Sequence, residues 1–137
     1  DPRLVVTGFV EDIRSVVRSA AVYIVPLRVG GGTRLKILDA MAMGKALVST
    51  SIGCEGIEVR TGEHLVVADT PEAFAEATVE LLRNPSRRLM IGRAARELVE
   101  RRYAWPIIAD QLIETYRSAI ANKKTTPKGT CAVRLEV

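Results

Sequence analysis

Three successive glycines, followed closely by basic residues and a carboxylate, form the stretch of this sequence best suited to chemistry. The segment RVGGGTRLKILDAMAMGKALVS covers residues 28–49 and places Gly30–Gly32 directly before a run with helical periodicity. Glycines let a ligand approach the backbone amides because no Cβ stands in the way. We interpret Thr33 as the N-cap of the helix, so the loop would offer unpaired N–H groups and a helix dipole. This combination suits a phosphate or a diphosphate.

Asp39 extends this interpretation toward a nucleotide. In a helix it would lie roughly 9 Å along the axis from Thr33, about the reach from a diphosphate to the hydroxyls of an attached ribose. The carboxylate could accept both ribose hydroxyls, while Arg34 or Lys36 met the phosphates. Two alternatives stay open: Lys36 and Asp39 could form an ordinary ion pair three residues apart, and the glycines could be a flexible connection.

Other motifs and conspicuous residues are less informative. A Walker loop is excluded because no Gly-Lys pair is followed by Ser or Thr, and the dinucleotide pattern fails because Leu35 stands where the third glycine should be. Glu55 and Glu58 could bind sugar hydroxyls, although loop carboxylates are more often simply solvated. We expect His64 to be a turn or surface histidine and Trp105 to be a core residue.

Composition restricts the class of protein. The 137 residues are 47% hydrophobic, enough for the core of one domain, and 20 basic against 16 acidic residues give a net charge of only +4. The basic residues are spread along helical stretches, so we expect no nucleic-acid partner. Cys54, a small buried filler, and Cys131 lack metal-ligand spacing, which predicts a reducing compartment. No apolar run has the length of a membrane span, and no signal-peptide pattern is present.

The first half of the chain alternates short β-branched runs with helical patterns. This alternation is typical of βαβ units on a parallel sheet, and the absence of period-2 patterning in residues 64–69 predicts a strand covered on both faces. Helices are expected over 11–20 and in the run after Thr33. The predicted strands are LVVTGF (4–9), VYIVPL (22–27), KALVST (45–50) and HLVVAD (64–69).

The second half is predicted to be helical. Thr70 followed by Pro71 predicts a helix start, and Asn84-Pro85 predicts its end. A second helix is expected after Ser86, with a break near Tyr103 and a third amphipathic helix beyond it.

From Asn122 onward the sequence loses periodicity and gains Lys, Thr, Pro and Gly. We therefore predict a domain over residues 1–121 and a tail, disordered or foreign to the domain, over 122–137. Because the chain begins with Asp1 rather than Met, we also expect it to be part of a longer protein.

The order of several motifs resembles a known family. The runs TGFVED, AAVYIVPL, GGGTRLKILDAMAMGKALVST, SIGCEGIEV, LVVADTPEAFAEA and MIGRAARELVERRYAW are similar, in this order, to the C-terminal domain of retaining GT-B-fold glycosyltransferases of group 1. The resemblance covers about residues 4–121. It implies an α/β fold, a Rossmann-like parallel sheet with flanking helices, of which the first strands are missing.

The resemblance also implies an activity and its partners. The protein would be a bacterial glycosyltransferase of polysaccharide synthesis that binds a nucleoside diphosphate sugar as donor, with an acceptor sugar or glycolipid held by an N-terminal domain outside this chain. Transfer would retain the anomeric configuration and need no metal or other cofactor. The location would be cytoplasmic or the inner face of the membrane. Two alternatives are a regulatory module that binds a nucleotide, and a GT-B epimerase or phosphorylase.

The family motif, two glutamates eight positions apart, falls on Gly31 and Asp39. By resemblance, Asp39 would bind the ribose, and backbone amides with Thr33 would replace the first glutamate. No residue is assigned a catalytic role. The residues implied to bind the donor diphosphate are Gly30, Gly31, Gly32, Thr33, Arg34 and Lys36.

The family's strand order, 3-2-1-4-5-6, carries a further expectation. Two central strands between LVVTGF and VYIVPL would be missing from this chain, which leaves apolar strand edges open. We predict that the chain alone is catalytically inactive, and that it self-associates through these strands or pairs LVVTGF in a non-native place.

Overall fold

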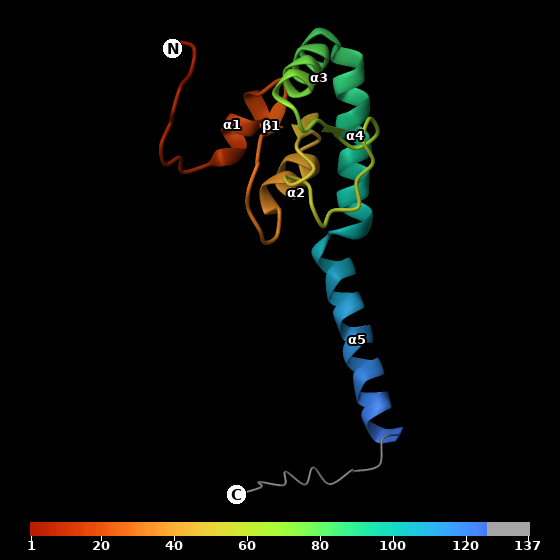
Figure 1. Cartoon of the computed structure of the whole chain (residues 1–137). Coiled ribbons are helices and arrows are strands. Elements are labelled where there is room, and N and C mark those ends of the chain that lie inside the picture. The colour runs from red at the N-terminus through yellow and green to blue at the C-terminus, as the bar shows by residue number, and fades with distance from the viewer. Residues whose placement is uncertain (126–137) are drawn as a thin grey trace, which may run out of the picture. The chain divides into compact units, whose positions relative to one another are not determined.

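Helices and short parallel strands alternate through the first half of the chain, and helices make up the second half (Figure 1). The computed structural model describes residues 1–125 and divides the chain into two units at Tyr103 and Ala104. The elements in chain order are α1 (Ile13–Ser19), β1 (Tyr23–Val25), α2 (Leu35–Ala42), β2 (Leu47–Ser49), β3 (Val66–Val67), α3 (Pro71–Arg83), α4 (Pro85–Arg102) and α5 (Trp105–Thr125).

The strands form a parallel sheet in the order β1-β2-β3, as the alternating pattern predicts. Tyr23 lies opposite Leu47 in β1 and β2, and Val48 lies opposite Val66 in β2 and β3. Every residue of the central strand β2 is buried. Leu47 and Val48 enter different apolar clusters because consecutive side chains of a strand point to opposite faces.

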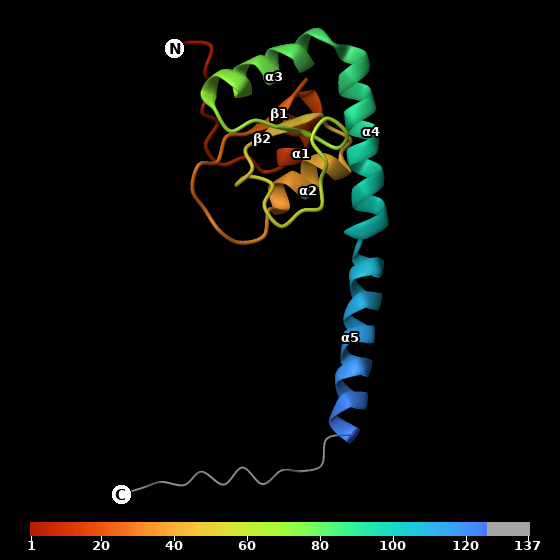
Figure 2. The same cartoon turned by 45° about the vertical axis from the view of Figure 1, so that its right-hand side comes forward.

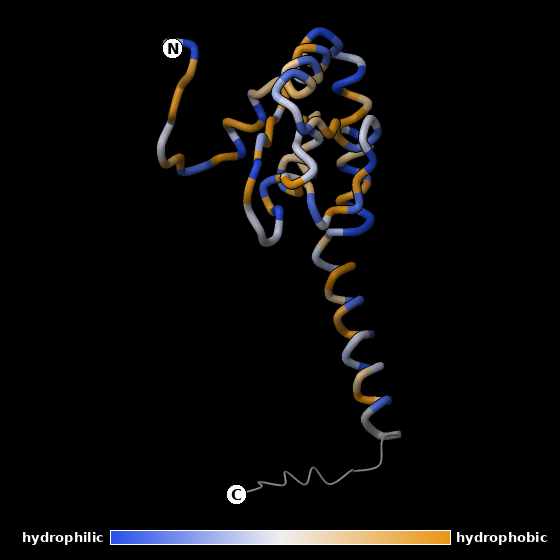
Figure 3. The backbone as a smooth tube through the Cα atoms, viewed as in Figure 1, coloured by the Kyte–Doolittle hydropathy of each residue, from blue (hydrophilic) through white to orange (hydrophobic). Residues whose placement is uncertain are grey.

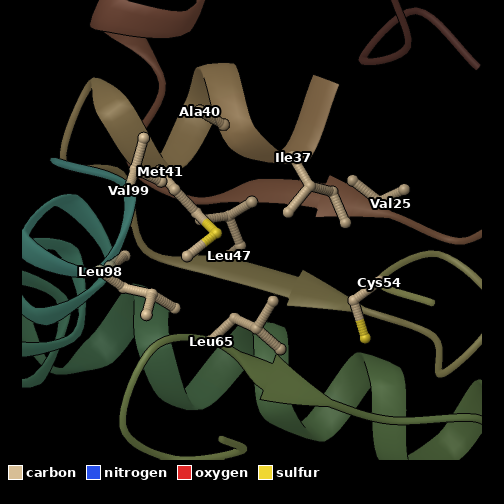
Figure 4. Close-up of a cluster of buried hydrophobic side chains, with 10 residues drawn as sticks. Val25, Ile37, Ala40, Met41, Leu47, Cys54, Leu65, Leu98 and Val99 are labelled. Carbon is tan, nitrogen blue, oxygen red and sulfur yellow. The ribbon is translucent and has the colours of Figure 1, made fainter. Parts of the chain in front are cut away.

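Helix α2 covers one face of the sheet. Its residues Ile37 and Met41 are fully buried and pack with Leu47 and Leu65, as Figure 4 shows. The pattern arises because positions 37 and 41 lie one helical turn apart and share a face. Helix α4 completes this cluster with Leu98 and its neighbours.

Helix α3 lies on the other side of the strands from α2 (Figure 2). Its start is the predicted one: the Thr70 hydroxyl accepts a hydrogen bond from the Ala73 amide, and Pro71 occupies the first turn. Asn84 ends α3 and caps α4, which begins at Pro85, two residues before the position expected from the sequence. Leu81 of α3 is fully buried in the second cluster.

The predicted strand LVVTGF is absent. Residues 4–9 form no strand, and Leu4, Val6 and Phe9 expose 73%, 87% and 92% of their surface. The run has the composition of a strand, but it finds no partner among the described residues, neither a native nor a non-native one. The other part of the expectation is confirmed within residues 1–125: there β1 pairs with β2 alone, so its second edge is open.

The second unit, described by itself, contains α5. Apolar and polar residues alternate along this helix (Figure 3). Trp105, expected in a core, is 85% exposed, so that prediction is wrong. The helix continues past Asn122 to Thr125, into the predicted tail, whose remaining residues lie outside the described part. No helix among the described residues has the length and apolar character required to span a membrane.

Candidate functional site

The glycine loop lies at the carboxyl end of β1, where it connects this strand to α2. Gly30 and Gly32 have positive φ values of 146° and 84°, a backbone conformation that residues with side chains rarely adopt. The φ of Gly31 is not positive. The base of the loop is fixed, because the Thr50 hydroxyl donates a 2.5 Å hydrogen bond to the Leu27 carbonyl oxygen. An open glycine loop before a helix at this edge of a parallel sheet is a favourable place for an anion.

Thr33 does not cap α2 as the sequence suggested. The helix begins at Leu35, its N-cap residue is Arg34, and no side chain makes a capping hydrogen bond. The reason is that the chain turns into the helix one residue later than predicted, which leaves Thr33 exposed in the loop. Its hydroxyl is therefore available to a ligand rather than to the helix.

Arg34 points into the protein. Its side chain is 6% exposed, Nη1 donates to the Gly31 carbonyl oxygen at 3.2 Å, and Nη2 donates to the Gly30 carbonyl oxygen at 2.9 Å. Nη2 also contacts the Glu55 carboxylate at 3.4 Å, and Nε is buried without a hydrogen-bond partner among the described residues. The guanidinium thus joins the glycine loop to the turn after β2.

Lys36 and Asp39 share a pocket on the outer side of α2. The pocket has a volume of about 560 Å³, and its other walls come from α1 and from Tyr23 of β1. In the described part of the chain no ion pair within 4 Å joins Lys36 to Asp39, so the simple ion-pair alternative is wrong. Burial raises the pKa of Tyr23, and the nearby Asp39 carboxylate adds to the increase. Asp39 therefore faces the pocket with its charge uncompensated by Lys36.

The two glutamates of the loop after β2 have structural partners. Glu55 contacts Arg34, and the Glu58 carboxylate pairs with Arg102. The Glu58 amide also donates a 2.9 Å hydrogen bond to the Tyr103 hydroxyl. The two Glu58 contacts hold the loop against α4. The side chains of Glu55 and Glu58 nevertheless remain 72% and 67% exposed, so both are solvated loop carboxylates that also form ion pairs.

His64 and Cys54 are both buried. His64 lies in a turn, as predicted, but it is only 6% exposed, and its Nδ1 accepts a hydrogen bond from the Arg60 amide at 3.0 Å. Cys54 is the buried filler that its type suggested, and burial raises the pKa of its thiol. Neither residue lines the pocket that Lys36 and Asp39 share.

No group of three or more His, Cys, Asp or Glu side chains that could hold a metal ion occurs within residues 1–125. The groups of the candidate site that a ligand can reach are backbone amides of the glycine loop, the Thr33 hydroxyl, the Lys36 ammonium and the Asp39 carboxylate. The structure gathers Lys36 with Asp39 and places the glycines at the start of the same helix, whereas Arg34 is turned away. The pairing of Arg34 with Glu55 could not be found from sequence spacing.

Comparison with known proteins gives consistent matches. Residues 1–84 match a family model described as glycosyl transferases group 1. A phosphatidyl-myo-inositol mannosyltransferase of Mycobacterium leprae is 35% identical over an alignment of 124 residues that covers 81% of this chain and 33% of that protein. A D-inositol 3-phosphate glycosyltransferase of Corynebacterium urealyticum is 33% identical over 110 residues, 79% of this chain and 26% of the relative.

A similar solved structure is that of sucrose-phosphate synthase from Thermosynechococcus elongatus. The match has a TM-score of 0.68 and 26% identity, and it covers 78% of this chain and 27% of that one. The chain thus spans about a third or less of the length of the proteins it matches.

Proposed function

Because the chain belongs to the group 1 glycosyltransferases, we propose that it forms the donor-binding part of an enzyme that transfers a sugar from a nucleoside diphosphate sugar. The acceptor, a sugar or a glycolipid, would be bound by a part of the protein outside this chain. Transfer would retain the anomeric configuration and require no metal. The observation that carries the proposal is the open glycine loop that leads into α2, with Asp39 farther along the same helix.

The donor diphosphate would bind at the glycine loop. Amides of Gly30, Gly31 and Gly32 and the N-terminus of α2 supply N–H donors and a positive dipole end. The Thr33 hydroxyl and the Lys36 ammonium add a neutral and a charged donor. As the bond to the sugar breaks, negative charge grows on the leaving diphosphate, and these fixed donors would stabilise it. They would thus act on the transition state as well as on binding.

The ribose would bind at Asp39. This carboxylate lies four residues after the start of α2, about 6 Å along the helix axis. It is exposed, lines the pocket with Tyr23, and has no ion pair with Lys36. An uncompensated carboxylate at this distance can accept hydrogen bonds from both ribose hydroxyls.

The names of two relatives suggest the chemistry of the substrates. They describe transfer of mannose to phosphatidyl-myo-inositol and of a glycosyl group to inositol 3-phosphate. By analogy, we propose mannose or a related hexose as the donor sugar and an inositol-containing or other polyol acceptor. A cytoplasmic site, at the inner face of the membrane for a lipid acceptor, belongs to the same proposal.

The decisive experiment uses the full-length protein that contains this chain. GDP-mannose, UDP-glucose and UDP-N-acetylglucosamine are tested for binding, for slow hydrolysis and for transfer to inositol acceptors. We expect one donor to bind and turn over without added metal. Binding without any turnover would instead favour a regulatory module, and interconversion of the sugar or phosphorolysis would favour an epimerase or a phosphorylase.

A variant tests the loop itself. The space around Gly31 is open, with no atom within 4 Å of an added Cβ, so Gly31→Val should leave the fold intact while its side chain obstructs the amides. We expect loss of nucleoside diphosphate binding with unchanged helix content in circular dichroism. A variant that binds the nucleotide as tightly as the parent would refute the anion site.

The self-association proposal has its own test. The free edge of β1 and the exposed residues 4–9 could pair with another copy of the chain. We propose that the isolated chain forms dimers or larger assemblies and is inactive. A stable monomer in light scattering that also turns over a nucleotide sugar would contradict both statements.

A further inference from the structure

We infer that Arg34 is a positioning residue of the glycine loop: it turns the amides of Gly31 and Gly32 outward and does not itself contact the diphosphate. The inference rests on the proposed function, because it concerns how the donor loop is shaped. It differs from the expectation from the sequence, which made Arg34 a direct phosphate ligand.

Peptide geometry transmits the effect of Arg34 to the amides. Nη2 and Nη1 hold the carbonyl oxygens of Gly30 and Gly31, at 2.9 and 3.2 Å. In a trans peptide the carbonyl of one residue and the N–H of the next point in opposite directions, and the described residues contain no cis bond. The N–H groups of Gly31 and Gly32 therefore point away from the guanidinium, toward the open side of the loop.

Both amides are free to bind a ligand. Within the described residues, no acceptor bonds to the N–H of Gly31 or Gly32. An added Cβ would meet no atom within 4 Å at either position, so the space around them is open. The two neighbouring N–H groups are thus directed to one side, and one of them belongs to Gly32, whose φ is positive. Such a pair forms a concavity that suits an anion.

Arg34 can hold this arrangement because its own position is fixed. The side chain is 6% exposed, and Glu55, from the turn after β2, contacts Nη2 at 3.4 Å. That turn is closely packed, since the amide of Gly53 donates to the Thr50 hydroxyl and a Cβ added at Gly53 would lie only 3.1 Å from the Val25 carbonyl oxygen. The loop carbonyls are thus tied to the sheet through one guanidinium.

The same contacts argue against direct phosphate binding by Arg34. Both terminal nitrogens already donate to the protein, and Nε is buried without access to solvent. Because the side chain is only 6% exposed, a phosphate would have to displace the protein groups that cover the guanidinium in order to reach it. Lys36, in contrast, is exposed in the first turn of α2, so its ammonium can reach a ligand without displacing other protein groups.

A double-mutant cycle on the full-length protein tests the inference, with inorganic pyrophosphate as the probe and calorimetry as the measurement. Arg34→Met releases the carbonyls, and Gly32→Ala distorts the loop because its φ of 84° disfavours a side chain. If Arg34 acts through the amides, each change weakens binding by about tenfold and the double variant is no weaker than either. Losses that multiply to about a hundredfold would show an independent contact and overturn the inference.

Two further variants keep the test decisive if Arg34→Met folds poorly. Arg34→Lys retains the charge but replaces the two terminal nitrogens, which hold the two carbonyl oxygens at separate points, by a single nitrogen on a flexible chain, so we expect it to lose affinity as Arg34→Met does. Retained affinity in Arg34→Lys would overturn the inference. Arg28→Met removes an exposed charge from the same loop, and an equal loss there would show that charge alone matters.

The outcome also separates this inference from the proposed function. If the parent protein binds neither pyrophosphate nor a nucleotide sugar, the proposed function fails and the role of Arg34 falls with it. If the parent binds both and the cycle is additive, only the positioning role is refuted.

Discussion

Replacement of Gly92 by alanine tests how closely α4 packs against the end of α2. An added Cβ at Gly92 would lie 2.1 Å from the carbonyl oxygen and 2.9 Å from the carbonyl carbon of Gly44. Both are backbone atoms, so no side chain can rotate away to make room. Gly44 itself has a φ of 67° and ends the turn after α2, which restricts its movement. Helix α4 must therefore move outward.

Two opposing effects set the magnitude. Alanine is favoured over glycine in a helix interior by about 1 kcal/mol, which would stabilise α4. The clash must open from 2.1 Å to at least 3.4 Å to reach ordinary contact. Overpacking of this kind costs about 1–3 kcal/mol and sometimes more. Separation of α4 would also loosen Ile91 and Ala95, both fully buried. We expect a net loss of about 2 kcal/mol, because lost core contacts add to the overpacking.

The assay is urea unfolding of the purified chain, followed by circular dichroism. The matched control is Gly31→Ala, which makes the same chemical change where no atom lies within 4 Å and φ is not positive. We expect the control to change the free energy of unfolding by about 0.5 kcal/mol or less in either direction. Equal or greater stability of Gly92→Ala relative to the parent would refute the packing argument.

Three other predictions concern the site and its supports. Asp39→Asn should weaken donor binding to the full-length protein by about 1–3 kcal/mol, the scale of a charge-assisted hydrogen bond. The same change should lower the pKa of Tyr23 in an ultraviolet titration, because the Asp39 carboxylate contributes to the raised pKa of this tyrosine. Unchanged donor affinity together with an unchanged Tyr23 titration would refute the placement of Asp39. Cys54 is tested in a variant in which the other cysteine is replaced by serine. Its thiol should resist thiol reagents at pH 7 until the protein unfolds, because burial both raises the pKa of the thiol and shields it from the reagent. Rapid labelling of the folded protein would contradict this prediction. Tyr103→Phe removes the acceptor for the Glu58 amide and should lower the free energy of unfolding by about 1 kcal/mol, whereas no change in urea unfolding would show that water replaces the hydroxyl.

Local signals in the sequence determined most of the elements. Thr70 and Pro71 begin α3 because a hydroxyl cap and a fixed φ act within one turn of chain. Asn84 ends one helix and caps the next for the same reason. The run HLVVAD over 64–69, which lacks period-2 alternation, predicts a strand covered on both faces, and it contains β3, whose two residues are half-buried. The glycine loop was also found at its place before α2, since glycine types mark a turn without tertiary information.

Pairing and orientation were decided only by the tertiary structure. The run over residues 4–9 has the composition of a strand, but a strand exists only when a neighbour supplies its hydrogen bonds, and none of the described residues does so. The direction of Arg34 depends on Glu55, which is 21 positions away along the chain. Local spacing suggested a phosphate ligand, whereas the carbonyl oxygens of Gly30 and Gly31 and this distant carboxylate draw the guanidinium inward. A charged side chain is oriented by whichever partners the fold brings within hydrogen-bond distance, and sequence spacing does not contain that information.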